Sequence, residues 1–254
     1  MRNPQANPVG YHNIDITKEW TILTVNFQNA DGTDIGIQEA FPACAGMTCA
    51  QSYTAADQIQ VMRADGGYDT YFLSNGHYGP GGRTFDANLT NKWANTLTAT
   101  VPATATLPVG STFWYVSRGA AAGNNHTITT AGGVDLAEKE TYEINKAWTL
   151  IGCPFPVEVA INGGIEVTGE TCAQSYTAAD QIQVMKADGG YDTYFLSNGH
   201  YGPGGRTFDA NLTNKWANTL TATVPTTDKF PVGGGAWYLS RKCEGTVKFI
   251  NPIK

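Results

Sequence analysis

Charged side chains are scarce in this chain, and no run of basic residues occurs in it. Only 15% of its 254 residues are charged, which is below the usual quarter, and the formal net charge is −6. Proteins that bind nucleic acid or anionic membrane surfaces present clustered lysine and arginine. The composition therefore argues against both partners, and we expect no nucleic acid to bind.

Long apolar runs are also missing. No stretch of about 18 apolar residues occurs, so the sequence predicts no membrane span. The start, MRNPQANPVG, lacks the apolar core of a signal peptide. This start fits either a cytosolic protein or a mature secreted form with an added Met, and the composition favours the second. We therefore expect an extracellular or cell-surface location.

The signatures of common enzyme classes are absent. The chain has no G-x-S-x-G elbow, no H-E-x-x-H zinc motif, no phosphate-binding loop and no dinucleotide fingerprint. Its histidines include no metal-binding pair at i, i+4 spacing. No pattern suggests the paired carboxylates of a glycosidase. We expect a protein that is not an enzyme and that needs no cofactor.

Four aspartates, Asp31, Asp34, Asp65 and Asp69, are candidates for calcium ligands. The first two lie in the segment DGTD, which lacks the spacing and the closing Glu of an EF-hand loop. Asp-Gly is primarily a turn-forming pair. The sequence therefore predicts no metal site.

Cysteine is rare, and no pair has the spacing of a zinc ribbon or finger. The short segment ACAGMTC predicts a small disulfide loop between Cys44 and Cys49. Cys172 is the repeat equivalent of Cys49, and its partner is either Cys153 or Cys243. One cysteine is left over in any scheme, and buried free thiols are the alternative.

An internal duplication is the most informative feature that is present. The segment 48–102 appears again at 171–225, and the two copies differ at one position, Arg63 against Lys186. The distance between the copies is close to the size of one typical domain. The sequence therefore predicts a flexible tail at 1–9 and two tandem domains, at 10–130 and 131–254.

The residue pattern is that of an all-β protein. DQIQVM, an Asp-Gly turn and YDTYFL predict a hairpin over Gln58–Leu73. The next segment, Ser74–Lys92, is rich in Gly and Asn and is expected to be a long loop. Closing strands are expected at Thr127–Thr130 and Val247–Ile250. We expect both domains to be β-sandwich-like or barrel-like, with their differences concentrated at 26–47 and 154–170.

Four segments follow in order in the second copy, namely WTLIGCPFP, ADQIQV, GGYDTYF and PVGGGAWYLS. This set resembles a β-rich module of bacterial secreted and cell-surface proteins. That module opens with a Trp-Asn-Leu-Ile-Gly-Asn-Pro-like strand and closes with a Pro-Gly-x-Gly-Phe-Trp-like strand. In the first copy the Gly and Pro are missing at Thr24–Phe27, so the likeness there depends on Trp20 and on spacing. The resemblance implies an extracellular, architectural or adhesive role and carries over no catalytic residue.

The segment GHYGPGG, at Gly76–Gly82 and again at Gly199–Gly205, is the most distinctive candidate for a binding site. Sugars stack on aromatic rings beside polar groups, and glycine lets a ligand approach the backbone. Alternatively, Gly, Pro and Asn only turn the chain, and the tyrosines cap a small core. The candidate ligand-binding residues are Tyr68, Tyr71, His77, Tyr78 and Arg83 in the first copy, and Tyr191, Tyr194, His200, Tyr201 and Arg206 in the second.

A non-enzymatic extracellular structural protein, such as a subunit of a fibre or layer, is the function that the sequence favours. The closing strand carries the β-favouring Val247, Phe249 and Ile250 with a single charge, Lys248. An open strand edge is a template for pairing with another chain, so we expect head-to-tail self-assembly through this strand. The alternative is a carbohydrate-binding or adhesive module with two equivalent sites, whose partners are glycans.

Overall fold

The computed structural model describes residues 8–137, 139–186 and 188–253. The chain divides into two compact units, Met1–Asp135 and Leu136–Lys254. Strands dominate both units and the helices are short, so the predicted all-β fold class is confirmed. No sheet in the described residues closes on itself, which leaves the sandwich-like form of the prediction.

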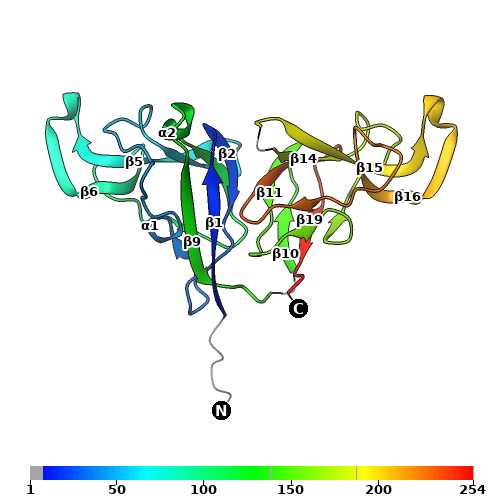
Figure 1. The fold of residues 1–254 in the computed structure, drawn as a ribbon, viewed down its shortest axis with the longest axis horizontal. Helices are drawn as coiled ribbons and strands as arrows, with labels where there is room; N and C mark the ends of the chain where they lie inside the picture. Colours follow the sequence, from blue (N-terminus) through cyan, green and yellow to red (C-terminus); the bar gives the residue numbers. More distant parts are fainter. Residues whose placement is uncertain (1–7, 138, 187, 254) are drawn as a thin grey trace, which may run out of the picture. The chain divides into compact units, whose positions relative to one another are not determined.

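The first unit is built from nine strands, two short helices and one 3₁₀ turn (Figure 1). In chain order they are β1 (Val9–Ile16), β2 (Trp20–Thr24), β3 (Ile35–Gly36), α1 (Ile37–Ala40), β4 (Gln58–Met62), β5 (Tyr68–Tyr78), η1 (Pro80–Gly82), β6 (Thr84–Asn95), β7 (Thr106–Leu107), β8 (Thr112–Val116), α2 (Arg118–Ala121) and β9 (His126–Gly133). Its main sheet has the order β2-β8-β4-β5-β6, and β1-β9 and β3-β7 form two further pairs.

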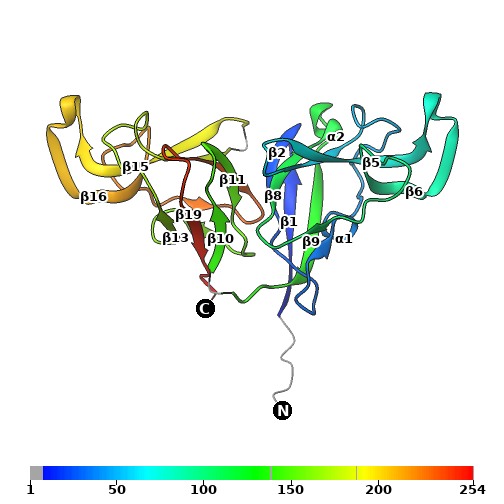
Figure 2. The same ribbon diagram turned by 180° about the vertical axis from the view of Figure 1, so that it is seen from behind.

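The second unit has the same five-stranded order, β11-β18-β14-β15-β16, but a different second sheet (Figure 2). Here three strands pair in the order β10-β19-β13, and β12 pairs with β17. In chain order its elements are β10 (Lys139–Glu143), β11 (Trp148–Gly152), β12 (Val159–Ala160), β13 (Ile165–Thr168), β14 (Gln181–Met185), β15 (Tyr191–Tyr201), η2 (Pro203–Gly205), β16 (Thr207–Asn218), β17 (Lys229–Phe230), β18 (Gly235–Leu239) and β19 (Thr246–Ile250).

Side-chain alternation explains how the sheets of each unit enclose a core. On β1 the side chain of Ile16 points inward beside Ile128 of β9, and both are fully or almost fully buried. They join Leu23, Ile59 and Phe113 of the five-stranded sheet in one apolar cluster. Burial of such side chains contributes about 1.5–3 kcal/mol each. The core therefore lies between two sheets, as in a sandwich.

The hairpin predicted over Gln58–Leu73 is confirmed, with β4 antiparallel to β5. Its turn follows the expected chemistry, because the Asp65 carboxylate accepts a hydrogen bond of 2.8 Å from the Gly67 N–H and Gly66 has a positive φ of 89°. In each unit two tryptophans on the first two strands of the main sheet pack edge to face. The ring centroids of Trp20 and Trp114 are 5.8 Å apart, and those of Trp148 and Trp237 are 6.1 Å apart.

The prediction of a long loop over Ser74–Lys92 is wrong. This segment continues β5, turns at η1 and returns as β6, so it forms a second hairpin. The sequence pattern does not predict these strands, because the start of β6, next to the turn, is largely exposed to solvent and shows no alternation. Leu89 is the first buried side chain of β6. Glycine and asparagine serve here as bulge and turn residues, and the register shifts at Asn75.

The proposed assembly strand is also corrected. Val247, Phe249 and Ile250 lie on β19, which pairs with β10 on one side and β13 on the other. Val247 and Phe249 are completely buried. A central strand has no free edge to offer, so the head-to-tail pairing expected from Val247–Ile250 does not fit this fold.

The predicted boundaries also differ from the structure. Of the tail predicted at 1–9, residues 1–7 lie outside the described residues, while Val9 begins β1 and the Pro8 carbonyl accepts a hydrogen bond from the Val134 N–H. The domain boundary predicted after Thr130 falls within β9, which continues to Gly133.

A buried carboxylate in each unit ties the main sheet together. Asp57, which has no exposed surface, accepts hydrogen bonds of 2.7 Å from both the Tyr115 hydroxyl and the Arg118 N–H. Asp180 does the same with Tyr238 and the Arg241 N–H, at 2.8 and 2.7 Å. Burial, reinforced by the carboxylate, raises the pKa of Tyr115 and of Tyr238 well above the usual range.

We predict that Asp57→Asn destabilises the first unit by about 2–4 kcal/mol, because an amide N–H would then face a donor in a buried site. Asp180→Asn should have the same effect on the second unit. Hydrogen exchange measured peptide by peptide assigns the loss of protection to one unit. Asp31→Asn, at an exposed turn, is the control and should change stability by less than about 0.5 kcal/mol. Equal protection in the Asp57→Asn variant and the parent would contradict the prediction.

Acid should destabilise the first unit selectively. Burial lowers the pKa of His12 and of His126, although Asp57 partly opposes the shift at His126. Among the residues that the structure describes, the buried His12 Nε2 has no hydrogen-bond partner. Since the unfolded chain binds these protons at a pKa near 6.5, the stability of this unit is complete above that pH and falls as the pH drops through it.

We expect a loss of about 1 kcal/mol between pH 7.5 and 5.5, measured as hydrogen exchange of the β1–β9 peptides. The second unit contains His200, which is exposed, and serves as the internal reference. The double variant His12→Gln/His126→Gln should lose most of this pH dependence. An undiminished pH dependence in that variant would show that other groups cause it.

Candidate functional site

The β5–β6 hairpin extends beyond the rest of the first unit, and the β15–β16 hairpin does the same in the second (Figures 1 and 2). Each hairpin lies entirely within the duplicated segment, so the two have the same sequence. Strand pairing is also the same: His77 lies opposite Phe85, and His200 lies opposite Phe208. The duplication therefore presents one surface twice.

The tip of the first hairpin is held by backbone conformations that only glycine adopts readily. Gly79, Gly81 and Gly82 have positive φ values of 75°, 67° and 65°. Gln51 braces the turn from outside the hairpin, because its Nε2 donates a hydrogen bond of 3.0 Å to the Gly79 carbonyl. A Cβ at Gly82 would lie 2.3 Å from the Gln51 Oε1. The tip is thus a fixed turn.

An imidazole and a phenyl ring form the exposed surface of this tip. The ring centroids of His77 and Phe85 are 5.0 Å apart, and Phe85 is 57% exposed. His77 Nδ1 lies 3.0 Å from the Gly82 carbonyl, so Nδ1 carries the proton and Nε2 is the acceptor of the ring. Arg83 follows the turn directly and is exposed. The tip therefore combines an apolar ring, a hydrogen-bond acceptor and a cationic side chain.

The second tip repeats these contacts. His200 and Phe208 are again 5.0 Å apart, and Phe208 is 57% exposed. His200 Nδ1 lies 3.0 Å from the Gly205 carbonyl, and the Gln174 amide donates a hydrogen bond of 3.1 Å to the Gly202 carbonyl. Because the same bonds form in both units, the surroundings outside the repeat do not determine the tip.

The structure brings together only some of the residues predicted to bind ligand. His77 and Arg83 share the tip, but Tyr68 begins β5 while Tyr78 ends it, and a strand of this length separates their Cα atoms by roughly 30 Å. Tyr78 packs against a small cluster around Phe72. The corresponding residues of the second unit divide in the same way. His200 and Arg206 are at the tip, and Tyr191 and Tyr194 are not. Tyr201 directly precedes the turn, but it packs against a small cluster around Phe195.

Sequence reasoning missed Phe85, Phe208 and the bracing glutamines. Phe85 lies in a segment that reads as a loop, so its ring had no predicted neighbour. The usable signal was its identical repetition in the second copy, since core packing alone does not require identical exposed residues. Gln51 is far from the tip in sequence, and its role depends on the fold.

Tyr71 lines a separate groove in the first unit. This groove, of about 460 Å³, lies beside the end of β6 and is lined by Tyr71, Asn95, Leu97, Thr98, Val101, Pro102, Ala103, Thr104 and Ala105. Leu97 is 84% exposed, so part of the lining is apolar surface open to solvent. The combination of a phenol ring, an amide and hydroxyls is typical of a polar ligand site.

The equivalent region of the second unit is closed over its tyrosine. Tyr194 is buried, and its hydroxyl donates a hydrogen bond of 2.9 Å to Asp228. Burial raises the pKa of Tyr194 above the usual range, and the Asp228 carboxylate adds a smaller contribution in the same direction. Asp228 also accepts from the Thr226 hydroxyl at 2.7 Å. The first unit has Ala105 and Ala103 at the matching positions, which explains why the groove is open there.

The disulfide predicted between Cys44 and Cys49 is not formed; all five cysteines are free thiols. The two thiols are directed to different partners: Cys44 donates to the Thr127 carbonyl at 3.4 Å, and Cys49 to the Asn91 side chain at 3.1 Å. Burial raises the pKa of both thiols, and Asp57 adds to the shift. These thiols are therefore weak nucleophiles at neutral pH.

Among the described residues, no group of three or more His, Cys, Asp and Glu is arranged to hold a metal ion. The aspartates considered as calcium ligands have local roles. Asp31 accepts hydrogen bonds from the Thr33 hydroxyl and N–H, and these bonds lower its pKa. Asp65 and Asp69 lie within 3.5 Å of the Arg63 guanidinium.

No family model, curated protein or solved structure matches the chain. The resemblance to a bacterial secreted module therefore stays a prediction. In the part of the chain that the structure describes, every helix is too short or too polar to cross a membrane.

We predict that Gly76→Ala disturbs the tip more than Gly66→Ala. Both glycines have a φ of 89°, so both substitutions carry the same backbone strain, about 1–2 kcal/mol. A Cβ at Gly76 would lie 2.5 Å from the Thr90 hydroxyl and 2.7 Å from the Phe85 ring, whereas Gly66 has open space. Gly76→Ala should cost a further 1–3 kcal/mol or so.

Chemical denaturation measures this difference, and the proton shifts of the Phe85 ring report its displacement from His77. The same pair of substitutions at Gly199 and Gly189 tests the second unit, because their φ values are 89° and 91° and a Cβ at Gly199 would lie 2.5 Å from the Thr213 hydroxyl and 2.7 Å from the Phe208 ring. Equal losses of stability for Gly76→Ala and Gly66→Ala would mean that the Phe85 ring is not held where the structure has it.

Proposed function

We propose that this protein is a non-enzymatic adhesive protein of the extracellular space or cell surface, which binds glycans through two equivalent hairpin tips. The observation that carries the proposal is Phe85 with its counterpart Phe208, each 57% exposed on a fixed turn beside a histidine. Large apolar rings that stay exposed on a rigid element are typical of binding surfaces.

The chemistry of the tip suits a sugar. The C–H face of a pyranose stacks on a phenyl ring, and sugar hydroxyls donate to an imidazole nitrogen or accept from a guanidinium. His77 offers Nε2 as acceptor, and Arg83 offers several donors within the same turn. Because Gln51 braces the turn, little conformational entropy is lost when the tip binds.

Two identical tips favour a target with repeated epitopes. A ligand held by the first tip raises the effective concentration of neighbouring epitopes at the second. The resulting gain in affinity for the surface needs no new contact, and it is lost when one tip is removed. A glycan-covered surface supplies epitopes in this form, whereas a single soluble sugar does not.

The self-assembling fibre, which the sequence favoured, has weaker support. Its expected contact was the terminal strand, but β19 is paired on both edges. The extracellular location and the absence of enzymatic activity remain proposals that rest on low charge, high β content and the resemblance to secreted modules.

The test is binding of the full-length protein to a glycan array, followed by surface titration of the best ligand. We expect Phe85→Ala or Phe208→Ala alone to weaken binding to a dense glycan surface about 100-fold, and the double variant to abolish it. Both rings are exposed, so the variants should keep the stability of the parent.

Tyr71→Ala is the matched control, because this ring lines the groove and not the tip. It should bind the array like the parent. Loss of binding in Tyr71→Ala with retention in the double Phe variant would move the site to the groove of the first unit. A parent protein that binds no glycan on the array would overturn the proposal.

A further inference from the structure

The groove beside the end of β6 has a matched counterpart in the second unit. Its lining residues from Tyr71 to Pro102 lie in the duplicated segment, so the second unit has the same side chains at those positions. Beyond that segment two lining residues differ, because the first unit has Ala103 and Ala105 where the second has Thr226 and Asp228. The second unit is therefore a natural double variant of the groove.

The backbone follows the same course at the two positions that differ. The Ala105 carbonyl accepts a backbone hydrogen bond of 2.9 Å, and the Asp228 carbonyl accepts one of 3.0 Å. Two residues earlier, the carbonyl at 103 accepts a hydrogen bond of 3.1 Å from the Gln38 side chain, and the carbonyl at 226 accepts one of 2.9 Å from Asn162. A difference between the two places is therefore a difference of side chains alone.

A chain of hydrogen bonds in the second unit shows what the tyrosine of this place binds. The Asn218 oxygen accepts from the Leu220 N–H at 2.9 Å, so the amide nitrogen is the group that hydrogen-bonds to the Tyr194 oxygen. The Tyr194 hydroxyl then donates to the Asp228 carboxylate at 2.9 Å. The tyrosine thus presents a donor to a carboxylate.

The first unit has the same chain without its last member. The Asn95 oxygen accepts from the Leu97 N–H at 2.8 Å, and the Asn95 amide nitrogen hydrogen-bonds to the Tyr71 oxygen. The phenolic proton is left to donate, as in Tyr194. Ala105 has no side-chain acceptor, so in the described part of the molecule the chain of hydrogen bonds ends at the Tyr71 hydroxyl, at the lining of the groove.

The second unit holds its carboxylate in acidic surroundings. Burial and the Asp228 carboxylate raise the pKa of Tyr194, and Asp192 adds to the shift. Asp228 is exposed, so its carboxylate keeps much of its hydration. In the first unit burial raises the pKa of Tyr71 and Asp69 adds to the shift, but Asp69 lies 3.5 Å from the Arg63 guanidinium. An anion therefore meets no greater repulsion there than Asp228 does.

Apolar side chains give the groove its second character. Leu97 is 84% exposed and Val101 is 54% exposed, and Pro102 also lines the groove. Thr98 and Thr104 add two hydroxyls that can donate to an anion. A volume of about 460 Å³ lies within the usual range for small-molecule sites. The groove therefore suits a ligand with one acidic group and a short apolar chain.

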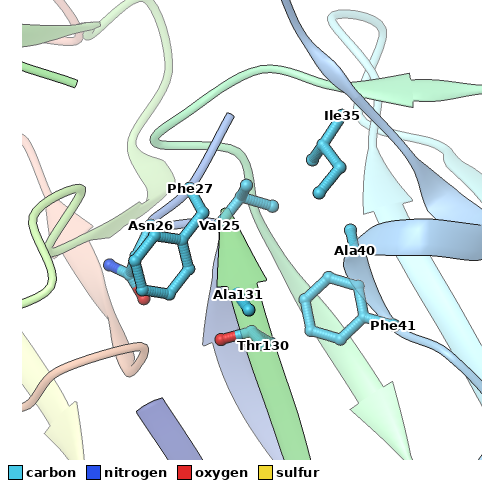
Figure 3. Close-up of a pocket in the computed structure, with 8 residues that line it drawn as sticks. All are labelled: Val25, Asn26, Phe27, Ile35, Ala40, Phe41, Thr130 and Ala131. Carbon is cyan, nitrogen blue, oxygen red and sulfur yellow. The ribbon is translucent and has the colours of Figure 1, made fainter. Parts of the chain in front are cut away.

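The cavity in Figure 3, in the same unit, has no room for a ligand. The side chains of Val25, Ile35 and Phe41 are among those that enclose it, and its volume is about 10 Å³. That volume is close to the minimum for one water molecule. Phe41 is itself almost completely buried, so the chain's own side chains fill this part of the unit.

We propose that the groove of the first unit binds a small aliphatic carboxylate, whose acidic group takes the place of the Asp228 carboxylate and whose apolar chain lies on Leu97 and Val101. The Tyr71 hydroxyl donates to the acid, as Tyr194 does to Asp228. A free acid is the occupant because the volume of the groove is near the lower end of the range for small-molecule sites. The site is separate from the hairpin tips and does not depend on glycan binding.

The probe is 4-methylpentanoate, added to the full-length protein. We expect a Kd of about 1–10 mM, with NMR shift changes at Tyr71 and residues 95–105. The uncharged 4-methylpentanamide should bind at least 5-fold more weakly, because hydrogen bonds to ionised acceptors are roughly twice as strong as those between neutral groups. Acetate, which lacks the apolar chain, should also bind at least 5-fold more weakly.

Exchanging the two side chains between the units is the decisive experiment. Ala103→Thr/Ala105→Asp gives the first unit the side chains of the second and should abolish binding, because the new carboxylate takes the Tyr71 hydroxyl. Thr226→Ala/Asp228→Ala gives the second unit the side chains of the first and should create a second site, seen as shift changes at residues 218–228. Each pair already fits the matching backbone of the other unit.

Tyr71→Phe removes the donor and keeps the ring, so it should weaken binding of 4-methylpentanoate at least 5-fold. Tyr194→Phe is the matched control. Its hydroxyl is already occupied by Asp228, and it should leave binding unchanged. If Thr226→Ala/Asp228→Ala fails to fold, Ala103→Thr/Ala105→Asp and Tyr71→Phe decide.

Four results would overturn the proposal. The first is the absence of shift changes in the parent at 20-fold the highest expected Kd, about 200 mM. The second is equal binding of the acid and the amide. The third is unchanged binding in Ala103→Thr/Ala105→Asp. The fourth is tighter binding of the peptide acetyl-Ala-Ala-Leu than of the free acid, because a peptide C-terminus would then be the occupant.

Discussion

A buried carboxylate in each unit is the interaction on which the rest of the sheet depends. The Asp57 side chain fixes the Tyr115 hydroxyl and the Arg118 N–H, and so joins the start of β4 to the end of β8. Its backbone is equally engaged: the N–H donates to the Thr48 carbonyl, and the C=O accepts from the Leu73 N–H of β5. Asp57 therefore fixes both the chain at Thr48 and the β4–β5 hairpin. Asp180 has the same place in the second unit.

The identical and the unlike parts of the two units have separate consequences. Identical sequence gives identical hairpin tips, down to the 5.0 Å separation between imidazole and phenyl rings. Unlike sequence begins on either side of the duplicated segment, and there the units diverge. Ala105 against Asp228 decides whether a tyrosine lines an open groove or is covered. The residues after Gln38 and Asn162 decide whether a third strand joins the second sheet.

Local chemistry was sufficient to predict part of this fold. The Asp-Gly turn predicts the β4–β5 hairpin, and the structure has that hairpin. The hairpin beyond Ser74 was not predictable, because a projecting strand pair buries few side chains and leaves no periodic signal. Strand order was not predictable either: Val247–Ile250 reads as an edge from its place near the chain end, but β13 covers it from a distant part of the sequence. At the candidate site, sequence supplied His77 and Arg83, whereas Phe85 and Gln51 required the fold.

Near-identity of the duplicated segments also sets a problem for the folding chain. Strand β4 pairs with β8 as β14 pairs with β18, and the pairing residues of β4 and β14 are the same. During folding, β18 can therefore recruit β4 with a ladder as good as the native one. Loop-closure entropy separates the two outcomes only weakly, because its cost grows with the logarithm of loop length. The contacts that discriminate lie outside the duplicated segment, and the chain must form them early to escape misassembly between its own halves.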